Sequence, residues 1–262
     1  LLILEFNCGR AMIEDLCEIT EVKLNQHIFK VLNLKDEYFL HFKELIIAKL
    51  PKYYLSTTSF QRTMILLGKE AAYKKLKLKF PQVLKLRSGD LGEVISSSYI
   101  EHHLDYLVPI NKIQWRDHRD MAMRGDDVIG LKIEGDNFKF IKCESKSAQK
   151  LSTSTLDEAR KELDSFDGRP SPHSIEFIIE RLYESGKQSL AEKLEIFNYT
   201  KTIKKSDVKH LLFVITKSNP DSLQRKAFES YIGDFCQISI GMKVDKHPEL
   251  VNEVFSGLEK KY

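Results

Sequence analysis

The chain has 262 residues, of which 42% are hydrophobic and 30% are charged, a balance typical of a soluble globular protein with one large domain or two small ones. The formal net charge is only +3, from 41 basic and 38 acidic residues. The molecule as a whole would therefore attract nucleic acid weakly, and any binding surface has to be local.

The sequence carries no signal peptide and no apolar run of membrane-spanning length. Its four cysteines lie far apart, without the spacing of a zinc site or a dense disulfide framework. These features predict a cytoplasmic protein without a membrane partner. The sequence begins with Leu1, which is consistent with a natural N-terminus further upstream.

The first third predicts a mixed α/β or mostly helical region. Strands are expected at residues 1–6 and 21–34. Helices are expected at 35–50, ended by Pro51, and at 59–76, with Ser59 as the N-cap. Pro81 marks the expected boundary between an N-terminal accessory region, 1–82, and a second domain, 83–262.

Two lysine-rich runs, 74–79 and 201–205, have two interpretations. Short charge runs are most often solvated surface, and we favour that interpretation. The alternative is a stripe that contacts phosphates.

The rest of the chain predicts an α/β sheet with helices packed on its faces. Its first helix, 88–104, carries Glu93 beside the apolar stripe, where the side chain either lines a cleft or faces solvent. Beyond a β-hairpin, we expect a helix at 155–166 with a capping box that begins at Thr155. The pattern is completed by one or two helices at 174–194, a buried strand at 210–216, a helix at 222–232, a strand at 236–244 and a helix at 247–258. No phosphate-binding glycine loop is present, which argues against intrinsic ATP use.

The hairpin joins strands at 127–133 and 138–144 through the turn Glu134-Gly-Asp-Asn137. If Ile133 faces Phe138, Asp127 lies opposite Glu144. Lys146 then projects to the same side, because side chains two residues apart on a strand share a face. A tighter turn would instead put Asp127 opposite Lys146, and the three residues would still share one face.

Two adjacent carboxylates repel each other unless a cation lies between them, and a hard cation with oxygen ligands is the usual solution. Magnesium is the natural candidate, because a cation held by two carboxylates keeps several waters and can also bind a phosphate oxygen. Lys146 would then position the attacking water or neutralise charge on the phosphate. This chemistry fits phosphodiester hydrolysis.

The pattern of Gly125 and Asp127 followed by Glu144 and Lys146 resembles the PD-(D/E)xK nuclease superfamily. The upstream Glu93, the Met-x-Gly-x-Asp hairpin and the long helical stretch after Glu-Ser-Lys are similar to the HamA family, the nuclease subunits of Hachiman-type bacterial anti-phage systems. The resemblance covers residue 86 to the C-terminus, whereas the first third matches no motif. It implies a restriction-endonuclease-like core, a mixed sheet flanked by helices.

The resemblance further implies a DNA nuclease that works with a helicase partner in defence against phage. Asp127 and Glu144 would bind Mg²⁺, with Mn²⁺ as a possible substitute. Lys146 would position water or stabilise the transition state, and Glu93 would support the metal or its water shell.

Three alternatives remain open at this point. Asp126 competes with Asp127 as the metal ligand, although the position of Asp127 in the register favours it. The acidic and basic residues of the hairpin could also form an ordinary exposed charge pattern, worth only about 0.2–1 kcal/mol. Finally, the protein could be a non-catalytic subunit that binds nucleic acid or regulates a helicase.

Overall fold

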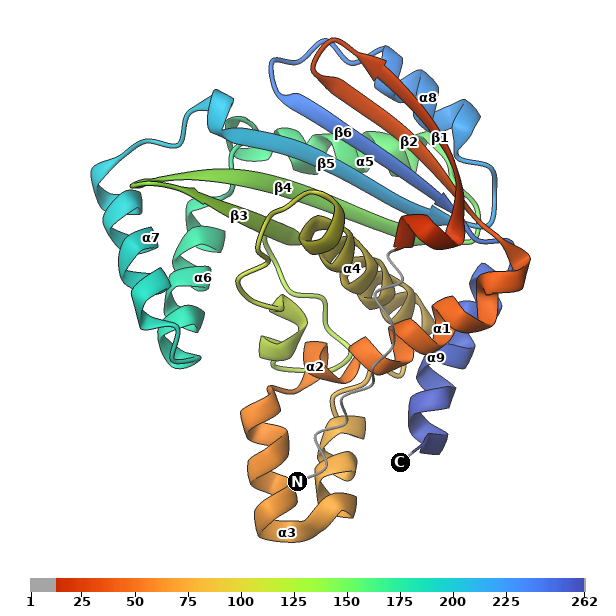
Figure 1. Ribbon diagram of the computed structural model, residues 1–262, viewed down its shortest axis with the longest axis vertical. Coiled ribbons are helices and arrows are strands. Elements are labelled where there is room, and N and C mark those ends of the chain that lie inside the picture. The colour runs from red at the N-terminus through yellow and green to blue at the C-terminus, as the bar shows by residue number, and fades with distance from the viewer. Residues whose placement is uncertain (1–12, 262) are drawn as a thin grey trace.

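The computed structural model describes residues 13–261, which build a mixed six-stranded sheet with helices on both faces (Figure 1). The strand order is β1-β2-β6-β5-β4-β3. The two edge pairs, β1 with β2 and β3 with β4, are antiparallel, and the contacts between β2, β6, β5 and β4 are parallel. The strands are β1 (Cys17–Leu24), β2 (His27–Leu34), β3 (Val128–Glu134), β4 (Asn137–Ala148), β5 (Val208–Thr216) and β6 (Cys236–Lys243). The predicted α/β fold with a mixed sheet flanked by helices is confirmed.

Nine α-helices surround this sheet within the described residues. They are α1 (Phe39–Lys49), α2 (Pro51–Tyr54), α3 (Thr57–Lys77), α4 (Leu84–His103), α5 (Thr153–Asp164), α6 (Pro172–Glu184), α7 (Gln188–Thr200), α8 (Asp221–Glu229) and α9 (His247–Lys261). Helices α1, α4 and α9 pack on one face, and α5 and α8 cover the other (Figure 1). Helices α6 and α7 pack against the β3–β4 hairpin. None of these helices combines the length and the apolar character needed to cross a bilayer.

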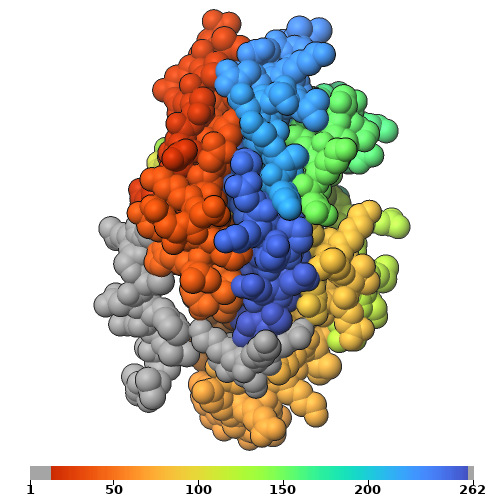
Figure 2. Space-filling model, turned by 90° about the vertical axis from the view of Figure 1, so that its right-hand side faces the viewer, coloured from red at the N-terminus to blue at the C-terminus, as the bar shows by residue number. Residues whose placement is uncertain are grey.

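The core is built on the alternation of side chains along β4 and β5. Leu211 and Phe213 point into the cluster around α4, and the intervening Leu212 packs against α5. Burial on both faces explains why the predicted strand 210–216 reads as a continuous apolar run. On the α4 face, α9 fills the space between α1 and the beginning of α4 (Figure 2).

The N-terminal third differs from the prediction in its strands. The segment 21–34, expected as one strand, forms parts of β1 and β2 around a turn in which Asn25 has a positive φ of 55°. The predicted strand 1–6 lies outside the described residues. Strand β2 pairs with β6 from the other end of the chain, so the sheet crosses the expected domain boundary. The division at residue 82 stays a prediction.

Two predicted helix starts were wrong, each for a local reason. Helix α1 ends before Pro51, as predicted, and Pro51 begins α2, where proline is tolerated in the first turn. Ser56, three residues before the predicted cap, accepts the Ser59 N–H at 3.1 Å and caps α3. Ser152 caps α5 in the same way through the Thr155 N–H, at 3.2 Å. The helix predicted at 59–76 is interrupted at Gly68, whose φ of 85° and ψ of 171° are not helical. The other predicted helices and strands lie within a few residues of those observed, except that α7 continues to Thr200, beyond the predicted end at 194.

Helix α4 approaches β4 closely at one glycine. A methyl group at Gly92 would lie 2.8 Å from Ser145 Oγ, closer than atoms pack. Ser88, one turn earlier, donates through its hydroxyl to the Ser147 carbonyl at 2.9 Å. The two contacts hold α4 against the end of β4, which places the neighbouring Glu93 near the end of the hairpin.

We predict opposite effects for alanine at two glycines of α4. Gly89→Ala should raise the free energy of unfolding by about 0.5–1 kcal/mol, because alanine favours helix and the added methyl meets nothing within 4 Å. Gly92→Ala should lower it by about 1–3 kcal/mol through overpacking. Adding Ser145→Ala should restore part of that loss, since the buried Ser145 hydroxyl has no hydrogen-bond partner among the described residues. Urea denaturation followed by circular dichroism measures all three, and equal effects at Gly89 and Gly92 would contradict the close approach.

Candidate active site

The hairpin register places Asp127 beside Glu144. Val128 pairs with Cys143 and Ile133 with Phe138, so continuing the ladder by one residue sets Asp127 opposite Glu144. The predicted register is confirmed, and the alternative that put Asp127 opposite Lys146 is wrong. The turn is shorter than predicted, because Glu134 and Asn137 already pair and only Gly135 and Asp136 lie between the strands.

The Asp127 carboxylate takes the place of a strand partner for β4. Strand β3 begins at Val128, so the part of β4 beyond Cys143 has no further β3 residue beside it. The Ser145 N–H donates instead to Asp127 Oδ2, at 3.0 Å. Because Ser145 lies between Glu144 and Lys146, this bond fixes the Asp127 carboxylate next to both.

Glu144 and Lys146 form an ion pair on the same side of β4. Lys146 Nζ lies 2.7 Å from Glu144 Oε1. Burial, with the charge of Asp127 second, raises the pKa of Glu144 to about 8 against the opposing effect of Lys146. Burial alone would lower the pKa of Lys146, but the Glu144 carboxylate outweighs it and the pKa is raised. The Glu144 carboxyl therefore loses its proton at a higher pH than an ordinary glutamate unless a further positive charge lies close to it.

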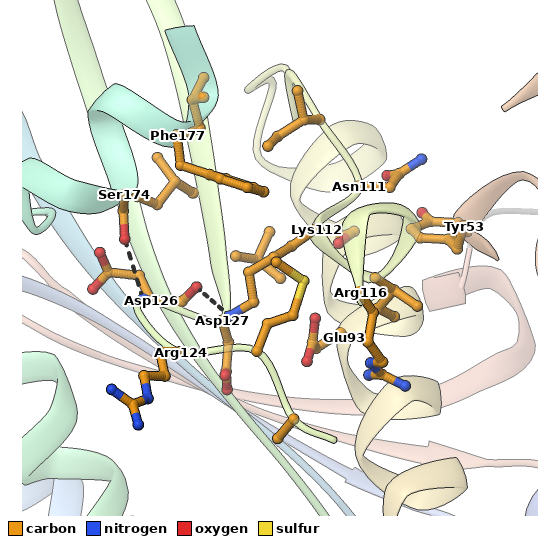
Figure 3. Close-up of a pocket in the computed structure, with 18 of the residues that line it drawn as sticks. Tyr53, Glu93, Asn111, Lys112, Arg116, Arg124, Asp126, Asp127, Ser174 and Phe177 are labelled. Atoms are coloured by element: carbon orange, nitrogen blue, oxygen red, sulfur yellow. Dashed lines mark hydrogen bonds between the residues drawn. The ribbon is translucent and has the colours of Figure 1, made fainter. Parts of the chain in front are cut away.

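Asp126 points away from this pair and fastens α6 to the hairpin. Its Oδ2 accepts the Ser171 N–H at 2.9 Å, and its Oδ1 lies 3.4 Å from Lys142 Nζ. Its own N–H donates to Ser174 Oγ, as the dashed line in Figure 3 shows. Gly125, with a φ of 89°, turns the chain just before the two aspartates. Asp126 and Asp127 point to opposite sides, as consecutive residues of an extended segment do. This geometry favours Asp127 over Asp126 as a ligand.

Glu93 reaches Asp127 from the other side, across a cavity of about 280 Å³ (Figure 3). Burial raises the pKa of Glu93 to about 8; Lys112 opposes that shift and Asp127 adds to it. Asp127 and Glu93 both line this cavity, whereas Glu144 and Lys146 do not. Asp127 is thus the carboxylate whose charge acts on both Glu93 and Glu144.

The sequence analysis missed two residues of the cavity wall, Lys112 and Arg116, and the buried Asp90 that pairs with Arg116. Lys112 donates to the carbonyls of Gly125 and Asp126, at 3.3 and 2.8 Å, and so holds the chain just before Asp127. Arg116 forms a buried ion pair with Asp90, one turn of α4 before Glu93. Arg116 belongs to a segment whose sequence predicts a charged loop. Because Arg116 and Asp90 are far apart along the chain, no local sequence pattern could have predicted their pairing.

The donor set fits a divalent cation held by two carboxylates. Asp127 is half-buried and Glu144 is buried, and burial first and the charge of Asp127 second raise the pKa of Glu144. Among residues 13–261, no group of three or more His, Cys, Asp or Glu side chains is arranged to hold a metal. A cation bound by this pair would keep several of its waters, as Mg²⁺ commonly does.

Comparison with known proteins agrees with the pattern of the hairpin. The family model described as HamA matches residues 10–258. The chain belongs to the HamA family. A Hachiman protein HamA from Bacillus cereus is 28% identical over 172 residues, which cover 66% of this chain and 61% of the length of that protein. The family match extends into the N-terminal third, where the sequence motifs alone showed no resemblance.

We predict that Glu144 makes the stability of this HamA protein depend on pH. Its pKa is about 8 in the folded state and near 4.5 when unfolded, so the folded state binds the extra proton between these values. In EDTA, the free energy of unfolding should therefore fall as pH rises from about 5 to about 8. Glu144→Gln should flatten this decline, leaving the part that Glu93 contributes. Urea denaturation at several pH values measures the slope.

Glu134→Gln, at the exposed hairpin turn, is the matched control and should keep the wild-type slope. A Glu144→Gln variant with an unchanged slope would show that Glu144 is not protonated in the folded protein.

Proposed function

We propose that this HamA protein is a metal-dependent nuclease of the PD-(D/E)xK type that hydrolyses DNA phosphodiester bonds. The observation that carries this proposal is the meeting of Asp127, Glu144 and Lys146 at one end of the hairpin, fixed by the Ser145 N–H bond and by the 2.7 Å ion pair. An exposed cross-strand charge pattern would not account for the burial of Glu144, whose exposed fraction is 7%. We interpret the mixed sheet and its helices as a restriction-endonuclease-like core.

Each side chain has a role that follows from its position. Asp127 and Glu144 would hold Mg²⁺, or Mn²⁺ in its place. The bound cation would supply Lewis acidity to the phosphate and lower the pKa of a water molecule. Lys146, held at Glu144, would orient the attacking water or offset negative charge on the phosphate. Glu93, on the far side of Asp127, would accept hydrogen bonds from the water shell and so restrict its orientation.

The HamA membership supports a role in defence against phage, as the effector subunit of a Hachiman system in the bacterial cytoplasm. We propose a helicase as the partner. A net charge of only +3 fits this arrangement, because a motor that delivers DNA removes the need for strong electrostatic attraction by the nuclease.

The proposal predicts metal-dependent DNA cleavage that depends on two side chains. Glu144→Ala and Lys146→Ala should each lower the cleavage rate in Mg²⁺ by about 100-fold or more, since each removes a group that acts directly at the phosphate or its metal. Cleavage of supercoiled and linear DNA, alone and with any helicase encoded beside the gene, measures the effect.

Lys132→Ala is the matched control. Lys132 lies on the same hairpin but pairs with Asp105 at 2.7 Å on the surface, so its loss should leave the rate unchanged. If folded wild-type protein binds DNA or the helicase yet cuts nothing under any condition, the protein is a regulatory subunit that retains the fold without the activity.

A further inference from the structure

The cavity beside Asp127 continues away from the carboxylates into an apolar space. Its walls come from five parts of the chain: α2, α4, the segment between α4 and β3, the start of β3, and the first turns of α6. The apolar side chains that line it include Ile110, Met121, Met123, Ile129, Phe177 and Ile178. A cluster of carboxylates that only bound a hydrated cation would need no such space.

Phe177 gives this cavity a flat aromatic wall. Figure 3 shows its side chain directed from α6 toward Lys112 across the cavity. The Arg181 guanidinium lies over the Phe177 ring at 5.3 Å and over the Trp115 ring at 4.8 Å, and it links α6 to the opposite wall. The ring is thereby held in place on its outer side. An aromatic wall of this kind stacks on nucleobases without regard to their sequence.

Size and position limit what can enter. At about 280 Å³ the cavity is just below the range of about 300–1,000 Å³ found for drug-sized ligands. It can accept one flat ring system and excludes a base pair. Because Asp127 lines the cavity, a phosphate bound at Asp127 and Glu144 would have its own nucleoside at the cavity mouth. Lys112 adds a positive charge there, which suits the sugar-phosphate backbone.

We propose that the cavity binds one unstacked base of the strand that is cut, next to the scissile phosphate. The substrate is then single-stranded DNA, or duplex DNA at positions where a base has left the stack. This inference rests on the proposed nuclease function and adds the form of its substrate. Recognition is by stacking and shape, so cleavage does not depend on base identity.

The test uses single-stranded oligonucleotides with one abasic nucleotide, cut by wild-type protein in Mg²⁺. The relative rate at each bond is read from the product lengths. Cleavage should fall about tenfold at one bond, at a fixed offset from the abasic site, because only that bond requires a base in the cavity. In Phe177→Ala total cleavage should fall and the local minimum should vanish, whereas Phe177→Tyr should keep it. Comparing bonds within one reaction makes the result independent of the folded fraction.

Phe166→Ala is the control for loss of an exposed phenylalanine elsewhere, and its pattern should match wild type. Vigorous cleavage with no minimum near the abasic site, or faster cutting of intact duplex than of single strands, would overturn this inference and leave the nuclease intact. Absence of any metal-dependent cleavage would overturn both.

Discussion

The site depends on one hydrogen bond between a side chain and the neighbouring strand. The Ser145 N–H donates to the Asp127 carboxylate where β3 has not yet begun. An unsatisfied N–H at that place would cost free energy, so the bond both ends the hairpin and fixes a negative charge beside Glu144. Lys146 then reduces part of the repulsion through its ion pair. What remains is a pair of carboxylates whose repulsion a bound proton or cation would relieve.

The surrounding helices make this arrangement rigid. Gly92 allows α4 to lie against Ser145, and the Ser88 hydroxyl bonds to the Ser147 carbonyl, so the helix that carries Glu93 cannot shift relative to β4 without losing contacts. Asp126 ties α6 to the same end of the hairpin. Two helices from distant parts of the chain therefore set the walls around a site whose charges come mainly from one hairpin.

The alternation of side chains along each strand explains why the hairpin could be predicted. Alternation along two strands and a short turn fix which side chains share a face, so Asp127, Glu144 and Lys146 could be grouped from the sequence. The preference for Asp127 over Asp126 followed from the same alternation of side chains, and it agrees with the observed hydrogen bonds. Neither conclusion required knowledge of tertiary packing.

The features that the sequence did not reveal depend on distant contacts. The Arg116–Asp90 pair and the Lys112 bonds join segments that no periodicity relates. Whether Glu93 faced a cleft or solvent was undecidable locally, because the answer depends on how closely α4 packs at Gly92. In the N-terminal third, β2 completes the sheet by pairing with β6, a contact across most of the chain. The turn at Asn25, with its positive φ, was missed because weak alternation continues through it.

We propose that Asp127 and Glu144 share one divalent cation. Titration calorimetry of Mn²⁺ or Mg²⁺ into the apo protein tests it most directly, with Asp127→Asn and Asp126→Asn as a pair that removes the same charge from adjacent positions. We expect one binding event that is lost in Asp127→Asn and retained in Asp126→Asn. Binding that survives in Asp127→Asn, or that is lost only in Asp126→Asn, would contradict it.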